Sequence, residues 1–568
     1  MISRGVVSVL LIGCCCALGE NYPFVSTSLG NITGVYEESY SDRIYSAFYS
    51  IPFAKPPVGE LRFQEPQPIS SWSGTWNASI KDIFCVQVVH TMKPGGDYIG
   101  DEDCLYLSVF VPNEDPGSIK EPLDVIVHVH GGAFMFGSAN SYAGPAFLMD
   151  RDVILVTISY RLGVLGFLST EDGVVPGNNG MKDQVLALKW IRDHIKSFGG
   201  NPESVTLTGL SAGGASVHLH YLSPLSRGLF ARGVSFSGNA LAPWVLQEEP
   251  LLKARMLGAQ VGCAQQETKE LVNCLKQRST YQLVESVKIL RPWLFNPFSP
   301  FGVVVEKGGD NRFLEEHPYL LLKNGKFYDV PWIISSTAEE GLYPAAEFAT
   351  DHNYFKDLEE RWLELAPFVL DYNYTVAAGK KDDVSKKIKR AYLKKKRISS
   401  ETFRVFVDMM SDRLFCISAE IAAKMHAFQA RSPVYFYYFA YLGDEIESFS
   451  IHFTKEDQRD GVSHGDDVMY IFSNPQTPII PRLPHLDELM KEKLLNMLTS
   501  FSSTNVPHMS KVDWEPVGKR DPVKMLYIRN PKDMSMEKIT KIERHRSMWA
   551  SIPFAENEGL FPTAKDEL

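Results

Sequence analysis

Cysteine and positive charge are both in short supply in this chain of 568 residues. No two of its 8 cysteines have the C-x-x-C spacing, which excludes zinc-ribbon and thioredoxin-like sites. Lys and Arg number 58 against 68 Asp and Glu, so the net charge is -10 at pH 7. Because phosphate binding needs clustered basic residues, this balance argues against nucleic acid as a partner. No window beyond the N-terminus reaches the roughly twenty consecutive apolar residues of a membrane span.

The overall composition is that of a large folded protein. Hydrophobic residues make up 44% and charged residues 22%, so a sizeable core is expected and disorder is not. Large α/β enzymes keep one many-stranded sheet as a single unit, and we therefore expect a single catalytic domain over residues 20–564. The one basic run, residues 380–397, is interleaved with apolar residues, which favours a solvated helix face over a binding patch.

Both ends of the chain resemble targeting signals. Residues 1–19 combine a positive charge at Arg4 with an apolar stretch of about fourteen residues, the pattern of a secretory signal peptide. Residues 565–568 read Lys-Asp-Glu-Leu, the signal that a KDEL retrieval receptor recognises. We therefore expect residence in the endoplasmic reticulum lumen, with secretion as the alternative because retrieval is saturable.

An oxidising compartment allows disulfides and glycans. Five cysteines follow the signal segment, and pairing nearest neighbours joins Cys85 to Cys104 and Cys263 to Cys274, leaving Cys416 over. Three N-x-S/T sites are candidate glycosylation acceptors: Asn31, Asn77 and Asn373.

Strand and helix patterns alternate through the first half of the chain. Apolar runs predict strands, a 3.6-residue period predicts helices, and this alternation indicates a parallel sheet covered by helices. Further helical stretches are predicted as a cap and outer layer. The expected strands include 123–130, 153–160, 205–208, 330–335 and 435–441, and the expected helices 182–198, 212–222, 250–275, 354–370 and 411–430.

A nucleophile elbow is the most informative motif. Gly209-Leu210-Ser211-Ala212-Gly213 spells G-x-S-x-G directly between a β-branched run and a helical pattern. A serine on a tight strand-to-helix turn projects its oxygen into a cleft, and the flanking glycines let the neighbouring backbone approach. Ser211 is therefore the candidate nucleophile.

An acyl-transfer site also needs donors for the oxyanion. The expected strand 123–130 leads into His130-Gly131-Gly132-Ala133, which matches the H-G-G-G type of oxyanion loop. The candidate donors are the backbone N–H groups of Gly132, Ala133 and Ala212. A simple turn at the two glycines is the alternative.

A serine nucleophile needs a base and an orienting acid. His464, in a turn-rich loop late in the chain, is the best-placed base, ahead of His452 and His485. His218 and His220 belong to the helix after Ser211 and are interpreted as structural. The acid is expected just after the strand at 330–335, where Glu340 is preferred to Glu339, although the local sequence does not separate the two.

Together these residues resemble the type-B carboxylesterase and cholinesterase family of α/β-hydrolases over nearly the whole chain. The resemblance implies an α/β-hydrolase fold with a large, mostly parallel central sheet, flanking helices and helical cap insertions. It implies the Ser211, Glu340 and His464 triad, the same two disulfides, and a buried hydroxyl of Ser237 behind the histidine. It also implies the buried ion pairs Arg62–Glu102 and Arg161–Asp183. Further matching segments are Pro56-Pro57-Val58-Gly59, Glu102-Asp103-Cys104-Leu105, Tyr160-Arg161-Leu162-Gly163 and Gly177-Asn178.

Some residues depart from the cholinesterase pattern. Leu210 stands where many family members have Glu, and residues 94–103 contain no Trp for cation–π capture of choline. Cys416 has no later cysteine with which to form the family's third disulfide. The pattern is most similar to insect carboxylesterases, including juvenile-hormone-esterase-like members. An apolar acyl pocket is expected from Trp244, Phe298 and Phe301.

The expected activity is therefore hydrolysis of small apolar carboxylic esters through an acyl-enzyme, with no metal and no organic cofactor. Three alternatives stay open. One is a slow-turnover scavenger of esters or organophosphates, and the second is a dedicated juvenile hormone or pheromone esterase. The third is a non-catalytic adhesion-type module on the same fold, because a fold does not imply a function.

Overall fold

The computed structural model describes residues 22–554 apart from 90–96, 142, 447, 449–460, 475–481, 510, 520–521 and 539. It describes no side chain at residues 97 and 352 or at residues 540–543. The expected signal segment 1–19 and the C-terminal tail 565–568 lie outside the described residues.

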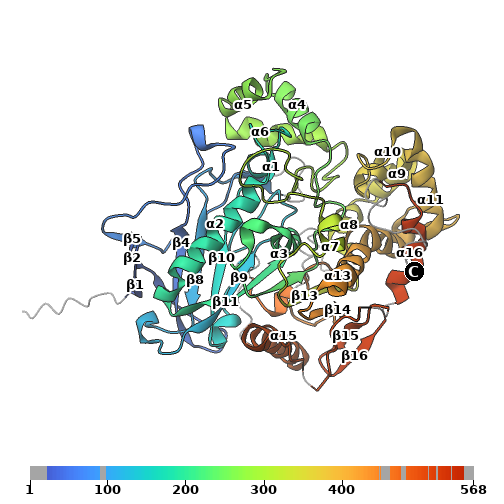
Figure 1. Cartoon of the computed structure of the whole chain (residues 1–568). Helices are drawn as coiled ribbons and strands as arrows, with labels where there is room; N and C mark the ends of the chain where they lie inside the picture. The colour runs from blue at the N-terminus through green and yellow to red at the C-terminus, as the bar shows by residue number, and fades with distance from the viewer. Residues whose placement is uncertain are drawn as a thin grey trace, which may run out of the picture.

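A large mixed sheet runs through the molecule (Figure 1). Its described strands lie in the order β16-β15-β14-β13-β12-β11-β9-β10-β8-β4-β3. The strands from β15 to β10 in this order are parallel, and the edge strands β16, β8, β4 and β3 pair antiparallel. Their bounds are β3 Val35–Glu38, β4 Ile44–Pro52, β8 Tyr106–Val111, β9 Leu123–Val129, β10 Val153–Ile158, β11 Gly200–Leu210, β12 Arg232–Phe236, β13 Trp332–Thr337, β14 Val434–Phe439, β15 Met525–Asn530 and β16 Asp533–Glu537.

Helices cover both faces of this sheet, which explains why its central strands are apolar throughout. In β9, Val125 and Val127 face the core cluster that includes residues of α2 (Asn179–His194) and α3 (Ala212–Leu222). Ile126, one residue along, faces the other cluster, to which α15 (His485–Thr504) contributes. Successive side chains of a strand point to opposite faces, so one apolar run fills two cores.

The predicted elements are present, with interruptions inside three predicted helices, and the predicted helix 182–198 ends in a 3-10 turn, Ile195–Phe198. The stretch 250–275 forms α4 (Pro250–Gln260) and α5 (Thr268–Lys276), because Gly262, at φ +76°, ends the first helix. The stretch 354–370 forms α9 (His352–Glu360) and α10 (Trp362–Val369). The stretch 411–430 begins with a π-helical turn, Asp412–Cys416, before α13 (Ile417–Gln429).

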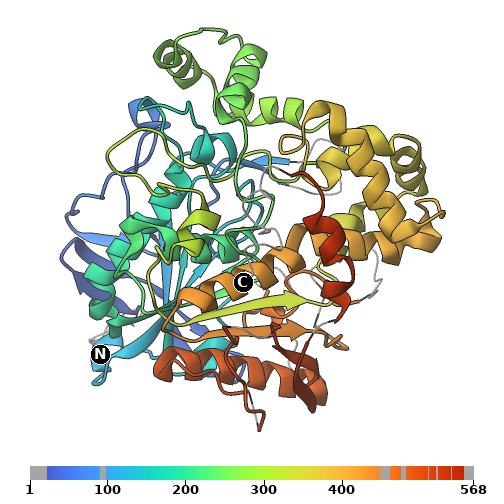
Figure 2. The same ribbon diagram turned by 45° about the vertical axis from the view of Figure 1, so that its right-hand side comes forward.

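The remaining helices form a cap and an outer layer (Figures 1 and 2). The basic run 380–397 contains α11, Lys381–Leu393, whose apolar side chains are buried, as predicted for a solvated helix face. Within the part of the chain that the structure describes, no helix has the length and apolarity needed to cross a bilayer. The other described α-helices are α1 Gly163–Phe167, α6 Thr280–Ser286, α7 Pro318–Lys323, α8 Leu342–Ala349, α12 Phe403–Ser411 and α16 Thr540–Ala550.

Two small sheets and two disulfides lie outside the central sheet. Strands β1 (Phe24–Thr27), β2 (Gly30–Thr33) and β5 (Thr75–Asn77) form one sheet, and β6 (Gln87–Val89) pairs with β7 (Asp97–Ile99). The disulfides Cys85–Cys104 and Cys263–Cys274 are both present, as nearest-neighbour pairing predicted, and Cys416 is buried outside them.

The ion pairs implied by the resemblance also form. Arg62 Nη2 lies 2.5 Å from Glu102 Oε2, and Arg161 Nη2 lies 2.7 Å from Asp183 Oδ1. Both arginines contact their carboxylates through two nitrogens, the geometry that makes arginine suitable for buried pairs. Arg161 directly follows Tyr160 and connects the end of β10 to α2, on which the carboxylate lies.

Candidate active site

Ser211 occupies the strained turn that the motif predicts. It follows β11 directly, precedes α3, and has φ 60° and ψ -119°, a conformation that a non-glycine residue adopts at a cost. A side chain at Gly209 would lie 2.4 Å from the backbone of Gly213, and one at Gly213 would lie 2.0 Å from the carbonyl oxygen of Val129. Both glycines are therefore required by close backbone packing, and the elbow is built as its sequence indicates.

The glycine loop after β9 lies against this serine. A Cβ atom at Gly131 would be 3.0 Å from Cβ of Ser211 and 2.8 Å from the carbonyl oxygen of Leu210. Gly132 and Ala133 have φ +103° and +54°. Among the described hydrogen bonds, none is donated by the backbone N–H groups of Gly132, Ala133 and Ala212 to a protein acceptor. The loop does turn here, because the Gly132 carbonyl accepts from the N–H groups of Met135 and Phe136 at 2.8 and 3.1 Å. Its role as an oxyanion loop stays a prediction.

Glu340 and His464 form a fully buried pair. Nδ1 of His464 lies 2.6 Å from Oε2 of Glu340, and the side chains are 1% and 0% exposed. The other carboxylate oxygen, Oε1, accepts from Ser237 Oγ at 2.6 Å and from the Thr337 N–H at 2.8 Å. Three donors thus fix the carboxylate, and the carboxylate fixes the imidazole.

The adjacent residue, Glu339, bonds to the backbone of the histidine loop and not to the imidazole. Its N–H donates to the Val462 carbonyl, and its Oε2 accepts from the Val462 N–H, both at 2.9 Å. Glu339 therefore anchors the loop that carries His464, while Glu340 contacts the imidazole itself. The pairing of β13 with β14 brings these two segments together, which explains why the local sequence could not separate the two acids.

Ser237 connects the acid to the nucleophile's backbone. It follows β12, adopts φ 49°, and donates to Glu340. The next residue, Gly238, lies so close to the Ser211 carbonyl oxygen that a Cβ atom there would be 2.0 Å away. Ser211, the glycine loop, Ser237 and Glu340 all follow carboxyl ends of adjacent parallel strands, the edge at which α/β sheets place their ligands.

The other candidate histidines that the structure describes are not placed for this chemistry. His220 Nε2 contacts Gln184 Oε1 at 3.0 Å, and burial lowers the pKa of His220 to about 3. His218 is stacked on Trp332 with ring centroids 4.2 Å apart, so both are structural, as interpreted from the sequence. His485 is exposed at the start of α15, and His452 lies outside the described residues.

Comparison with known proteins identifies the family of this chain. The Carboxylesterase family matches residues 21–548. Venom carboxylesterase-6 of Apis mellifera is 42% identical over 545 residues, covering 95% of this chain and 96% of that protein. Esterase FE4 of Myzus persicae is 38% identical over 550 residues, covering 95% and 93%.

This chain belongs to the carboxylesterase family. It is a serine hydrolase of carboxylic esters. The crystal structure of juvenile hormone esterase from Manduca sexta, with OTFP covalently attached, superimposes with a TM-score of 0.82 at 27% identity. The match covers 93% of this chain and 99% of that one, and the α/β-hydrolase fold expected from the resemblance is confirmed.

An aromatic cluster lies beside the site of this carboxylesterase. Trp244 is 2% exposed, and its ring centroid lies 5.8 Å from that of Phe298 and 6.3 Å from that of Phe134. Ser299, next to Phe298, donates to the Ala133 carbonyl at 3.0 Å, which ties the cluster to the glycine loop. Phe301 is fully buried two residues further on, in the main core.

Sequence reasoning missed two aromatic neighbours of His464. Tyr343, on α8, stacks on His464 with centroids 5.3 Å apart and an interplanar angle of 24°. Phe415, in the π-helical turn, lies 4.6 Å from the His464 ring and 6.0 Å from that of Trp244. The position of Tyr343 three residues after Glu340 was an available signal, whereas nothing local marks Phe415.

A buried carboxylate behind the pair was also missed. Asp467, three residues after His464, accepts from Tyr437 Oη at 2.6 Å and from Ser335 Oγ at 2.9 Å. Burial raises the pKa of Asp467 to about 6, although both hydrogen bonds and His464 lower it. Two acids thus lie beside one imidazole, and only Glu340 has a described hydrogen bond to it.

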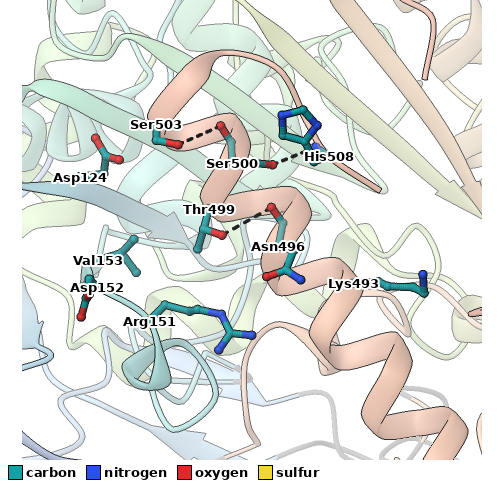
Figure 3. Close-up of a pocket in the computed structure, with 10 residues that line it drawn as sticks. All are labelled: Asp124, Arg151, Asp152, Val153, Lys493, Asn496, Thr499, Ser500, Ser503 and His508. Atoms are coloured by element: carbon teal, nitrogen blue, oxygen red, sulfur yellow. Dashed lines mark hydrogen bonds between the residues drawn. The ribbon is translucent and has the colours of Figure 1, made fainter. Parts of the chain in front are cut away.

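A polar groove of about 700 Å³ lies at the amino ends of the parallel strands, opposite to the ends that hold Ser211 (Figure 3). It is lined by Asp124 and Val153, at the amino ends of β9 and β10, and by α15. The hydroxyls of Thr499 and Ser503 are bonded to carbonyls of their own helix. This groove is therefore separate from the carboxyl edge where Ser211 lies.

Proposed function

We propose that Ser211, His464 and Glu340 act as the nucleophile, the base and the orienting acid of this esterase. The observation that carries the proposal is the fully buried Glu340–His464 pair at 2.6 Å, on the sheet edge that holds the strained Ser211. A serine hydroxyl is a weak nucleophile until a base takes its proton. Glu340 occupies Nδ1, so Nε2 is the nitrogen that receives it.

In the acylation step, Ser211 Oγ attacks the ester carbonyl carbon as Nε2 of His464 takes the hydroxyl proton. The negative charge that forms on the carbonyl oxygen is stabilised by the N–H groups of Gly132, Ala133 and Ala212. The carbon–oxygen bond to the alcohol then breaks, and His464 returns the proton to the departing alcohol. An acyl group is left on Ser211.

Deacylation repeats the sequence with water. His464 takes a proton from water, the resulting oxygen attacks the acyl carbon, and the bond to Ser211 breaks while His464 protonates the serine. Throughout, Glu340 holds the imidazole and stabilises its charged form, and Ser237 holds Glu340. Neither step requires a metal or an organic cofactor.

The acyl group of a small apolar ester is assigned to the aromatic cluster. Trp244 and Phe298 contact each other beside the glycine loop, and Phe415 connects Trp244 to His464. Phe301 supports this wall from within the core. Apolar pockets discriminate by only about 1–3 kcal/mol per methylene, so this wall favours a class of acyl chain rather than one substrate. Juvenile-hormone-like esters belong to this class, which a relative's name also suggests.

A slow-turnover scavenger is the second candidate. The Manduca sexta juvenile hormone esterase carries covalently attached OTFP, so one protein of this fold forms a covalent adduct. The same chemistry with slow deacylation would make this chain a binder of esters and organophosphates. The deacylation rate separates the two functions.

The endoplasmic reticulum lumen is the proposed location, with secretion as the alternative. Support comes from the sequence of residues 1–19 and 565–568, which implies a KDEL retrieval receptor as partner. Of the candidate glycan sites, Asn77 is exposed, whereas Asn31 and Asn373 are half-buried and accept from Ser26 and Lys381. Asn77 is therefore the site we expect to carry a glycan most completely.

The proposed function is tested by the time course of p-nitrophenol release from a short-chain p-nitrophenyl ester, with wild type beside Ser211→Ala. Steady turnover that is lost in the variant supports the proposed esterase. A burst of about one equivalent of p-nitrophenol followed by almost no further release supports the scavenger. Release that the variant retains, or no release from the wild type, contradicts the proposed nucleophile, and the second result would favour a binding module.

A further inference from the structure

The π-helical turn Asp412–Cys416 touches the catalytic site on one side and the C-terminal helix on the other. It lies between α12 and α13, and its side chains are buried except that of Arg413, which is partly exposed. Single π-helical turns within α-helices are rare and are frequent at functional sites. What the turn contacts on each side indicates its role.

On the inner side, the turn holds two groups of the candidate site. The Leu414 carbonyl accepts from Trp244 Nε1 at 2.8 Å. The next residue, Phe415, has its ring 6.0 Å from that of Trp244 and 4.6 Å from that of His464. A shift of this turn would therefore move the aromatic wall and the neighbour of the base together.

On the outer side, Asp412 is the anchor. Its Oδ2 accepts from Tyr392 Oη, on α11, at 2.5 Å and lies 3.3 Å from His545 Nδ1, on α16. Tyr392 Oη in turn accepts from Trp549 Nε1, also on α16, at 2.7 Å. Arg546 and Glu420 add an ion pair of 3.0 Å between α16 and α13. Figure 1 shows α16 beside α11 and α13.

Losing these outer contacts costs free energy because the Asp412 carboxylate is buried. The Asp412 side chain is 5% exposed, and burial raises its pKa. A buried carboxylate that loses a hydrogen-bond donor is destabilised, so Asp412 moves or recruits another donor when one is removed. Neither described disulfide lies in this region, and the turn is held by these side-chain contacts.

We propose that Asp412 is a positioning residue of the esterase: its bonds to Tyr392 and α16 fix the π-helical turn, and thereby hold Phe415 against His464 and limit the length of acyl group accepted. Tyr392 and Trp549 act through Asp412. The inference rests on the proposed function, because it takes His464 as the base and Trp244 as part of the acyl wall.

The test uses the full-length protein and a series of p-nitrophenyl esters from acetate to octanoate. Tyr392→Phe keeps the ring and removes the hydroxyl that links Trp549 to Asp412. Phe415→Leu shortens the proposed wall directly. Tyr45→Phe is the matched control, because Tyr45 is also buried and donates to a carboxylate. Its acceptor is Glu37, at 2.7 Å, on the edge strand β3.

We expect Phe415→Leu to raise the octanoate-to-acetate ratio of kcat/KM. Tyr392→Phe should raise the same ratio about fivefold, the equivalent of one lost hydrogen bond. Its kcat for acetate should stay within about twofold of wild type, since the triad is intact. In the double variant the ratio should equal that of Phe415→Leu alone, because Tyr392 acts through Phe415. Tyr45→Phe should leave the ratio unchanged.

A ratio in Tyr392→Phe no different from that in Tyr45→Phe would overturn the inference, as would independent, multiplicative effects in the double variant. If Tyr392→Phe does not fold, Trp549→Phe replaces it, because that change removes the indole donor, together with part of the ring, and keeps the Tyr392 hydroxyl on Asp412. The proposed function fails separately, when wild-type turnover does not depend on Ser211. With Ser211-dependent turnover and unchanged selectivity, only the positioning role is wrong.

Discussion

Glu340 uses its two carboxylate oxygens for two different partners: Oε2 lies 2.6 Å from His464 Nδ1, and Oε1 accepts from Ser237 Oγ at the same distance. All three side chains are buried. The imidazole is thereby held through a chain of hydrogen bonds that begins just after β12, passes through the loop after β13 and ends on the loop after β14. Any change that alters the acid alters the tautomer and orientation of the base.

Glu340→Gln should lower kcat by on the order of 10⁴, because an amide can donate to Nδ1 and favour the wrong tautomer. The matched control is Glu339→Gln, since Glu339 anchors the histidine loop through the Val462 backbone and the amide oxygen can still accept. Steady-state rates on p-nitrophenyl butyrate measure both variants. Equal losses of kcat in the two variants would mean that neither glutamate alone is the orienting acid.

Ser237→Ala should lower kcat about tenfold with little change in KM, because one charged hydrogen bond to Glu340 is lost while substrate contacts are kept. Ser235→Ala, two residues earlier on β12, removes a hydroxyl that donates to the Gly214 carbonyl instead. It should lower the thermal midpoint and leave kcat unchanged. A kcat loss in both variants would point to a general weakening of β12.

Gly131→Ala should lower kcat/KM by about 10²–10³, the loss expected when one oxyanion donor is misplaced. The added methyl group would lie 3.0 Å from Cβ of Ser211 and 2.8 Å from the Leu210 carbonyl oxygen, so the elbow or the glycine loop must shift. Gly379→Ala is the control, because its methyl group meets open space. Activity of Gly131→Ala near that of Gly379→Ala would show that the loop tolerates displacement.

How much of the site was predictable depends on how local each contact is. Ser211 and its glycines were predictable because strand, turn and helix are contiguous in the sequence. Glu340 was preferred for its place beside Gly341, a choice that the family resemblance also implies, but its separation from Glu339 requires the neighbouring β14 segment. Phe415 was missed because its approach to His464 depends on a π-helical turn, and a 3.6-residue pattern predicts a continuous α-helix there.

The same distinction applies to the fold. The central strands were predictable from continuous β-branched and aromatic runs, since burial on both faces leaves no polar alternation. The break within the predicted helix 354–370 was not, because apolar residues continue across it, whereas Gly262 was an available stop signal inside 250–275. The edge strand β16 carries polar residues at every second position and is exposed or half-buried along its length, so it lacks the apolar run that revealed the others.

Asp467 predicts a specific pH dependence of stability. Burial raises its pKa from 3.8 to about 6, so the folded state holds this proton more tightly than the unfolded state does. The stabilisation is therefore greatest below pH 3.8 and is lost as the pH rises to about 6. The lost free energy of unfolding is about 3 kcal/mol for this one group.

Asp467→Asn removes the titration while keeping a side chain that can accept from Tyr437 or Ser335. Thermal midpoints of both proteins at one scan rate, from pH 4 to pH 7, measure the effect against all other titrating groups. The difference, wild type minus variant, should fall as the pH rises and level off above about pH 6, the folded-state value for Asp467. Parallel midpoint curves would mean that the Asp467 carboxyl is already ionised at pH 4, and that its hydrogen bonds outweigh burial.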